Sequence, residues 1–140
     1  DAESVEEVDY ITAAAPTKKT LNVNGELNHN NYIANIDKVE YAEKETRVYF
    51  TIKNQGRAKI YIFSNSTKLI QNGKQLEQEY RFEPDSYPEI ASEISPGASS
   101  SGIFVFPAIN LNDSFCFIIE GYSDDFDEEI SPYEFNIPAN

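Results

Sequence analysis

Apolar and polar residues alternate along most of the chain with a period of two, which is the pattern of half-buried β-strands. In the run 47–53, every second residue is large and apolar, and runs 102–106, 115–119 and 133–137 behave similarly. Residues on the shared inward phase of the first three runs should line a core: Val48, Phe50, Ile52, Phe104, Phe106, Phe115, Phe117 and Ile119. The alternation therefore predicts antiparallel strands with one buried face.

Turn residues divide these runs. Asn72-Gly73 is the sequence of a type I′ hairpin turn, and Asn54-Gln55-Gly56 ends the run 47–53. Ser95-Pro96-Gly97 also reads as a turn, with proline where φ near −65° is wanted. Between Ile36 and Val39 the apolar phase slips by one residue, which predicts a β-bulge or a bend near Asp37.

The spacing of these signals predicts seven to nine strands, and no long helical period follows Pro16. An all-β, antiparallel two-sheet sandwich is the fold class that suits this pattern. Residues 1–19 differ and are predicted to be an acidic leader or linker. They form either one short helix, for which 4–7 have capping-box spacing, or a flexible tether. Residues 20–140 are predicted to be the domain, with residues 1–16 contributing little to its stability.

Charge narrows the classes of partner. The 140 residues include 24 acidic and 11 basic side chains, for a net charge of −13. All the basic residues lie between Lys18 and Arg81, whereas 82–140 hold half of the acids. This balance opposes binding to nucleic acid or to an anionic membrane surface. The excess negative charge either keeps the chain soluble and monomeric, or it forms an acidic face that binds a cationic partner.

Two segments resemble a known family. The first is the stretch 47–56, a strand followed by Asn-x-Gly. The second is the stretch 94–107, in which a Pro-Gly turn leads into a Gly-containing strand that ends in Phe-Pro. The strand 115–121 also fits the family pattern. These segments are similar to immunoglobulin-like domains of surface lipoproteins and secreted antigens of Gram-positive bacteria, over about residues 20–137. A bacterial proteinase-inhibitor group shares the Asn-terminated strand. The resemblance implies an immunoglobulin-like sandwich at the cell surface, and it brings no catalytic residues.

Residues suited to catalysis are scarce. One His, one Cys and no Met or Trp exclude an internal disulfide, a Cys/His zinc site and most His-based catalysis. His29 lies in a polar stretch and is expected to be a solvated loop residue. Cys116, between two phenylalanines, is expected to act as a small hydrophobe rather than a reactive thiol. We assign no catalytic, cofactor or metal residues.

An acidic run is the strongest candidate for chemistry. Five carboxylates fall within six residues: Asp124, Asp125, Asp127, Glu128 and Glu129. Calcium needs six to eight oxygen ligands, but the EF-hand spacing is absent and nothing in the run makes the side chains converge. We therefore expect an exposed, solvated loop without a metal. The 18 aromatic residues offer a second candidate, a patch for sugar or peptide, although a sandwich core uses many of them.

These observations favour a non-enzymatic, extracellular interaction module of a bacterial surface protein, either lipoprotein-anchored or secreted. Its partner would be an unknown protein, peptide or glycan. One alternative is an inhibitor of a secreted protease, in which the exposed stretch 83–88 enters the protease. A second alternative is a small hydrolase with two facing carboxyl groups, one of them with a raised pKa.

Overall fold

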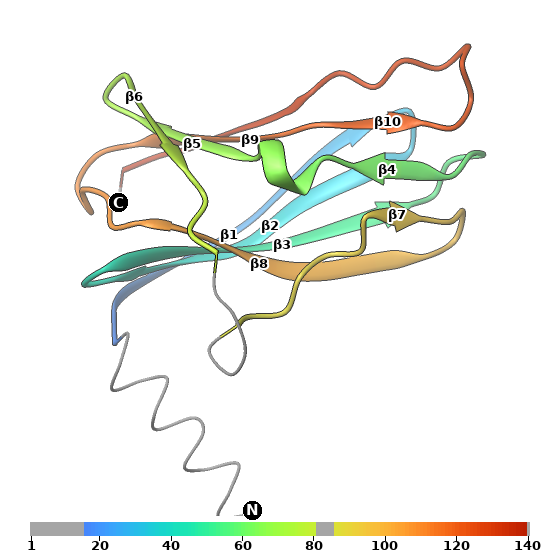
Figure 1. The fold of residues 1–140 in the computed structure, drawn as a ribbon. Helices are drawn as coiled ribbons and strands as arrows, with labels where there is room; N and C mark the ends of the chain where they lie inside the picture. The colour runs from blue at the N-terminus through green and yellow to red at the C-terminus, as the bar shows by residue number, and fades with distance from the viewer. Residues whose placement is uncertain (1–15, 81–85, 140) are drawn as a thin grey trace, which may run out of the picture.

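The computed structural model describes residues 16–80 and 86–139 (Figure 1). The elements in these residues are β1 (Thr17–His29), β2 (Tyr32–Ala42), β3 (Glu45–Asn54), β4 (Ile60–Ile62), the 3₁₀ turn η1 (Ser64–Ser66), β5 (Lys68–Gln71), β6 (Lys74–Glu77), β7 (Glu93–Ile94), β8 (Ser99–Pro107), β9 (Phe115–Ile119), β10 (Gly121–Ser123) and β11 (Tyr133–Ile137).

The strands form two layers. One layer is a four-stranded sheet in the order β1-β2-β3-β8. The facing layer contains a sheet in the order β11-β9-β5-β6 and a small sheet in the order β10-β4-β7. Only Glu120 separates β9 from β10, so these two strands follow one line in Figure 1. Every strand pair in the described residues is antiparallel.

The predicted all-β sandwich is therefore confirmed, although the strand number differs. The described residues hold eleven strands rather than seven to nine. The excess comes from short segments: β7 has two residues, and β4 and β10 have three each. Alternation cannot be recognised in runs as short as β7 and β10, whereas β4 lies within the β-rich run 58–63.

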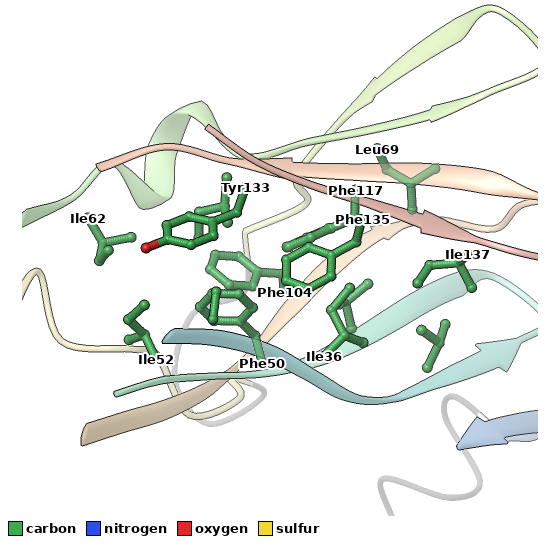
Figure 2. Close-up of a cluster of buried hydrophobic side chains, with 14 of the residues drawn as sticks. Ile36, Phe50, Ile52, Ile62, Leu69, Phe104, Phe117, Tyr133, Phe135 and Ile137 are labelled. Carbon is green, nitrogen blue, oxygen red and sulfur yellow. The ribbon is translucent and has the colours of Figure 1, made fainter. Parts of the chain in front are cut away.

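The core lies between the layers (Figure 2). All eight residues predicted to line it are buried, with at most 5% of any of them exposed. Phe50 lies at the centre, where its ring meets Phe104 edge to face at a centroid distance of 5.7 Å and Phe135 at 6.4 Å. The ring of Phe117 lies 6.0 Å from Phe50. Aromatic residues from both layers thus pack against one another in the core, and each of them buries a large apolar area.

The predicted irregularity in β2 is confirmed. The register of β2 on β3 shifts between Ile36 and Lys38. Tyr32, Ala34 and Ile36 are buried before the shift, and Val39 and Tyr41 are buried after it. The bulge at Asp37 thus keeps apolar residues of both phases on the inner face.

The predicted hairpin turn is also confirmed. Asn72 and Gly73 join β5 to β6 with φ values of 51° and 78°. A type I′ turn needs positive φ at both central residues, and asparagine and glycine accept this conformation at the least steric cost.

Two turn motifs that lie about 40 residues apart in the sequence meet through Asn54. Asn54 is 1% exposed, and its amide nitrogen donates to the carbonyls of Ala58 (2.7 Å) and Ile94 (2.9 Å). Its side-chain oxygen accepts from the backbone N–H of Gly56 (3.0 Å), and its backbone oxygen accepts from Gly97 (2.7 Å). The Asn-x-Gly and Pro-Gly signatures are therefore two halves of one hydrogen-bonded corner.

The first strand starts earlier than the predicted domain boundary. Residues 17–19, which the sequence assigned to the leader, begin β1. The side chain of Arg47 donates to the hydroxyl of Thr17, and Lys19 donates to the carbonyl of Leu111 at 3.3 Å. The sequence pattern does not reveal the start of this edge strand, because one face of the strand points to solvent and carries polar residues. The expected helix or tether in residues 1–15 lies outside the described residues.

Candidate functional site

Three aromatic rings form a row on the outer face of β4 and β10. Tyr61 and Tyr122 are cross-strand partners, and their rings stack at a centroid distance of 4.8 Å. Phe63, directly after β4, stacks on the other side at 5.2 Å from Tyr122. We call Tyr61, Phe63 and Tyr122 the aromatic face. Phe63 is 45% exposed and Tyr122 is 46% exposed, so the row presents apolar surface to solvent.

The backbone brings these rings together. Gly121 pairs with Ile62, and a Cβ atom at position 121 would lie only 2.6 Å from the carbonyl oxygen of Tyr61. Glycine therefore allows β10 to approach β4 closely. The N–H of Phe63 donates to the carbonyl of Glu120 (2.9 Å), which fixes the start of η1 against β10.

The acidic loop, residues 124–129, follows the aromatic face and is anchored to the domain. A carboxylate oxygen of Glu128 accepts hydrogen bonds from the hydroxyls of Tyr32 and Ser123, the latter at 2.7 Å. Arg57 lies 2.8 Å from a carboxylate oxygen of Asp125 and 4.0 Å from one of Glu128. Burial, together with the hydrogen bond to Glu128, raises the pKa of Tyr32. Two of the five carboxylates thus hold the loop in place.

Backbone hydrogen bonds shape the rest of the acidic loop. Asp124 N–H donates to the carbonyl of Lys59 (2.8 Å), and Asp127 N–H donates to the Asp125 carboxylate (3.0 Å). Glu128 N–H closes a turn on the carbonyl of Asp125 at 3.0 Å. Phe126, at the tip of this turn, is 102% exposed. The loop therefore displays a phenylalanine on an ordered support.

The expectation of a solvated loop is correct for part of this segment only. Asp124, Asp127 and Glu129 are exposed, but Asp125 and Glu128 are half-buried. The sequence pattern shows the charges but not the contacts with Arg57 and Tyr32, because both residues lie more than 60 positions before the loop. The sequence does contain a signal for the aromatic face, because all four residues of the run 60–63 are apolar. Side chains of a strand alternate between its two faces, so two of these four apolar side chains must lie on the outer face of the sheet.

We expect the acidic loop to bind no calcium tighter than about 10⁻⁴ M, the tight edge of extracellular calcium modules. Asp125 and Glu128 are already engaged by a cation and by hydroxyl donors. A calcium titration followed by calorimetry at physiological ionic strength measures this. The control is Asp124→Asn with Asp127→Asn. We expect this control to leave the melting temperature unchanged or slightly higher, because like charges are removed. Saturable, tighter binding that this variant abolishes would contradict the prediction.

A buried ion network lies on the outer face of the first sheet. Arg47 is 4% exposed and contacts the carboxylates of Glu45 at 2.7 Å and Glu40 at 2.9 Å. The Tyr49 hydroxyl donates to Glu40 at 2.7 Å, and the Tyr87 hydroxyl donates to Glu45 at 2.8 Å. The alternation rule placed Arg47 and Tyr49 on a solvent face, so sequence analysis missed this network. Its contacts point to a structural role.

The network makes stability depend on pH. Burial alone would raise the pKa of Glu40, but hydrogen bonds from Tyr49 and Arg47 outweigh it and lower the pKa below its ordinary value of 4.5. A lowered pKa stabilises the fold above pH 4.5, and this stabilisation is lost as the pH falls through the folded value. We expect Glu40→Gln to cost about 1–2 kcal/mol at pH 7, and we expect this cost to shrink as the pH falls below 4.5 and through the folded pKa of Glu40. Urea unfolding across this range measures it. Glu26→Gln, at an exposed position of β1, is the control and should change stability by less than about 0.5 kcal/mol at each pH.

The two reactive residue types lie apart. His29 ends β1 half-buried, with its ring edge-on to Tyr133 at a centroid distance of 4.4 Å, so the expected solvated loop position is wrong. Cys116 lies half-buried in β9 on the outer face of its sheet, and burial followed by the charge of Glu134 raises its thiol pKa. A raised pKa agrees with the expectation of an unreactive thiol. In residues 16–80 and 86–139, no three His, Cys, Asp or Glu side chains form a metal-binding group.

The stretch 83–88, proposed as an inhibitory loop, falls partly outside the described residues. Its described part is Ser86, Tyr87 and Pro88. Tyr87 is half-buried and tied to Glu45, and the carbonyl of Pro88 accepts from Ile103 N–H at 2.9 Å. This end of the stretch is thus attached to the first sheet.

Comparisons with known proteins establish the fold. A scan against protein families and a search of curated sequences found no match. Among solved structures, the chain is similar to a candidate lipoprotein (ycdA) from Bacillus subtilis, with a TM-score of 0.64 and 14% identity. The similarity covers 84% of this chain but only 39% of that one. A functionally unknown protein from Listeria monocytogenes has a TM-score of 0.61 and 9% identity, over 89% of this chain and 86% of that one.

At these identities the similarity shows the fold alone. Both neighbours come from Gram-positive bacteria, which is compatible with the resemblance to domains of surface lipoproteins. None of the helical structure in the described residues is long and apolar enough to cross a membrane. The chain is thus an all-β sandwich whose structural neighbours include a candidate lipoprotein and a protein of unknown function.

Proposed function

We propose that this chain is a non-enzymatic interaction module of an extracellular bacterial surface protein. It binds a protein partner through the aromatic face and the acidic loop. The immunoglobulin-like resemblance and the neighbour described as a candidate lipoprotein support the surface address, either lipoprotein-anchored or secreted. The binding role rests on one observation, the concentration of exposed aromatic side chains at one end of the sandwich.

Four large apolar side chains are highly exposed among the described residues, and three of them lie in or beside β4 and β10. These three are Phe63, Tyr122 and Phe126, whereas Tyr80 lies elsewhere. Single exposed apolar residues need no explanation, but a cluster of them is typical of an interaction site. Aromatic residues also dominate the energetics of protein interfaces.

The acidic loop indicates the chemistry of the partner. Phe126 projects fully into solvent between Asp124, Asp127 and Glu129, which are exposed as well. An apolar anchor surrounded by carboxylates is complementary to an apolar pocket with Lys or Arg at its rim. Such charges accelerate association at low salt, while the buried aromatic group contributes most of the affinity. Because hydrogen bonds already order the loop, little entropy is lost on binding.

Two observations favour this proposal over the alternatives. Protease inhibition through 83–88 requires a projecting loop, yet Tyr87 and Pro88 are attached to the first sheet. A carboxylate-dependent hydrolase requires a carboxyl group with a raised pKa, whereas the pKa of half-buried Glu40 is lowered. The aromatic face is exposed and lines neither of the described cavities, which suits a partner surface better than a small substrate.

Binding to intact Gram-positive cells tests the proposal. Fluorescently labelled protein is titrated onto Bacillus subtilis cells before and after protease treatment of the cells. We expect saturable binding that weakens with salt and disappears after protease treatment. The variant Phe63→Ser/Tyr122→Ser/Phe126→Ser should bind at least about tenfold more weakly, as expected when aromatic anchors are removed.

Tyr80→Ser is the matched control, because Tyr80 is also an exposed tyrosine but belongs neither to the aromatic face nor to the acidic loop. It should bind like the native protein. Equal binding by the triple variant would show that the aromatic face is not the site. Binding that survives protease treatment and follows purified cell-wall polysaccharide would replace the protein partner with a glycan.

A further inference from the structure

A small cavity opens at the edge of the first sheet. Its volume is about 100 Å³. Figure 1 shows the chain after β6 descending from one layer to β8 in the other, and the cavity lies where these parts meet. The residues that line it come from η1, from the segments after β6 and before β7, and from β8.

Hydrogen bonds hold the walls of the cavity in place. Glu79 N–H donates to the carbonyl of Val105 (2.7 Å), and Ile103 N–H donates to the carbonyl of Pro88 (2.9 Å). Both flanking segments are therefore attached to the free edge of β8. The side-chain amide of Gln78 donates to the carbonyl of Ser64, which links the same region to the other layer. The cavity is thus part of the folded framework.

The lining has a distinct chemistry. The lining includes two carboxylate residues, Glu79 and Glu89, two tyrosines, Tyr80 and Tyr87, and apolar residues of β8 such as Phe104. None of the described lining residues is Lys or Arg. The Tyr87 hydroxyl donates to Glu45 at 2.8 Å, so its ring is held in place, whereas Tyr80 is 57% exposed.

Size further limits the occupant. A water molecule takes about 30 Å³ of liquid volume, so the cavity has room for a group of a few heavy atoms. Sites for drug-sized ligands are several times larger, at roughly 300–1,000 Å³. A small head group fits, while the rest of a ligand would extend past Tyr80 into solvent.

We propose that this cavity binds a small organic ammonium group between Tyr80, Tyr87, Glu79 and Glu89. Aromatic rings attract cations through their negative faces, most strongly alkylated ammonium ions that lose little hydration. The two carboxylates supply the opposite charge, and the apolar lining residues accommodate methyl or methylene groups. None of the three residues of the aromatic face lines this cavity.

Choline and ethylamine are the probes, because a comparison of their affinities shows whether the cavity prefers a quaternary or a primary ammonium group. Each is titrated into the isotope-labelled full chain at constant ionic strength and followed by amide chemical shifts. We expect saturable shifts confined to amides of the cavity lining, with a Kd of the order of 10⁻³ M for choline, as for one weakly desolvated cation–aromatic site. The neutral isostere 3,3-dimethylbutanol should bind at least about tenfold more weakly, because it lacks the charge.

Variants identify the residues responsible. Tyr80→Ala should weaken choline binding about tenfold, and Tyr80→Phe should preserve it, because the ring face and not the hydroxyl makes the contact. Glu89→Gln should also weaken binding and reduce its dependence on salt. Tyr122→Ala, an exposed tyrosine on the other layer, is the control and should change nothing.

Three outcomes would overturn the proposal. Equal binding of 3,3-dimethylbutanol would show an apolar cavity without preference for cations. Shifts that rise linearly and spread over the acidic surface would show non-specific ion association. Unchanged choline affinity in both Tyr80→Ala and Glu89→Gln would place the cation elsewhere. Both residues are exposed, so these variants are expected to fold, and the amide spectrum reports this directly.

Discussion

Replacing Phe50 with alanine should lower the free energy of unfolding by about 3–5 kcal/mol, a large fraction of the stability of a domain of this size. Phe50 is fully buried, and rings from both layers surround it. The substitution removes apolar burial and leaves a cavity that neighbouring rings cannot fill without leaving their rotamers. Urea unfolding followed by far-UV circular dichroism measures the loss.

Two further variants serve as controls for the Phe50→Ala measurement. Phe50→Leu keeps much of the volume and should cost less than the alanine variant. Phe126→Ala removes the same side chain from a fully exposed position and should stay within about 0.5 kcal/mol of the native protein. A loss below about 1 kcal/mol for Phe50→Ala would mean that the two layers do not pack around this ring.

Replacing Asn54 with alanine should cost about 2–4 kcal/mol, because it removes three hydrogen bonds at once. The carbonyls of Ala58 and Ile94 would lose their donor, and the N–H of Gly56 would lose its acceptor. Buried polar groups left without a partner pay their desolvation cost in full. Chemical unfolding measures this loss, and hydrogen exchange should show faster opening around Ile94.

The neighbouring exposed amide supplies the control, since Gln55→Ala should change stability by less than about 0.5 kcal/mol. Asn54→Asp separates donor from acceptor functions. It keeps the oxygen that faces Gly56 but places a carboxylate against two carbonyl oxygens, so it should destabilise the fold at neutral pH. Native-like stability of both Asn54 variants would mean that the corner is held together without this side chain.

The sequence by itself determined the local features of the fold. Alternation placed Phe50, Phe104 and Phe117 in the core, because a strand in a two-layer sandwich has one face to bury. Asn72-Gly73 specified its turn, since few residue pairs accept two positive φ values. The bulge near Asp37 was readable because a phase slip cannot otherwise keep both sets of apolar residues inside.

Contacts between distant segments were not predictable in this way. The sequence marked Asn54 as the end of a strand, but its bonds to Ile94 and Gly97 exist only once β3 and the turn before β8 meet. Arg47 has the phase of a solvent-facing residue, and only the approach of Tyr87 and the neighbouring carboxylates makes its site buried.

The candidate sites depend on tertiary structure for the same reason. Charge counting located the acidic run, while the folded chain decided that Glu128 meets Tyr32 and that Phe126 faces solvent. Tyr80 and Glu89 reach the cavity because their neighbours Glu79 and Pro88 form backbone hydrogen bonds with β8, which lies far from Tyr80 in sequence. Period and propensity act over a few neighbouring residues, and they set which face of a strand is apolar. Which strands lie together, and therefore which side chains share a site, depends on the packing of the two layers.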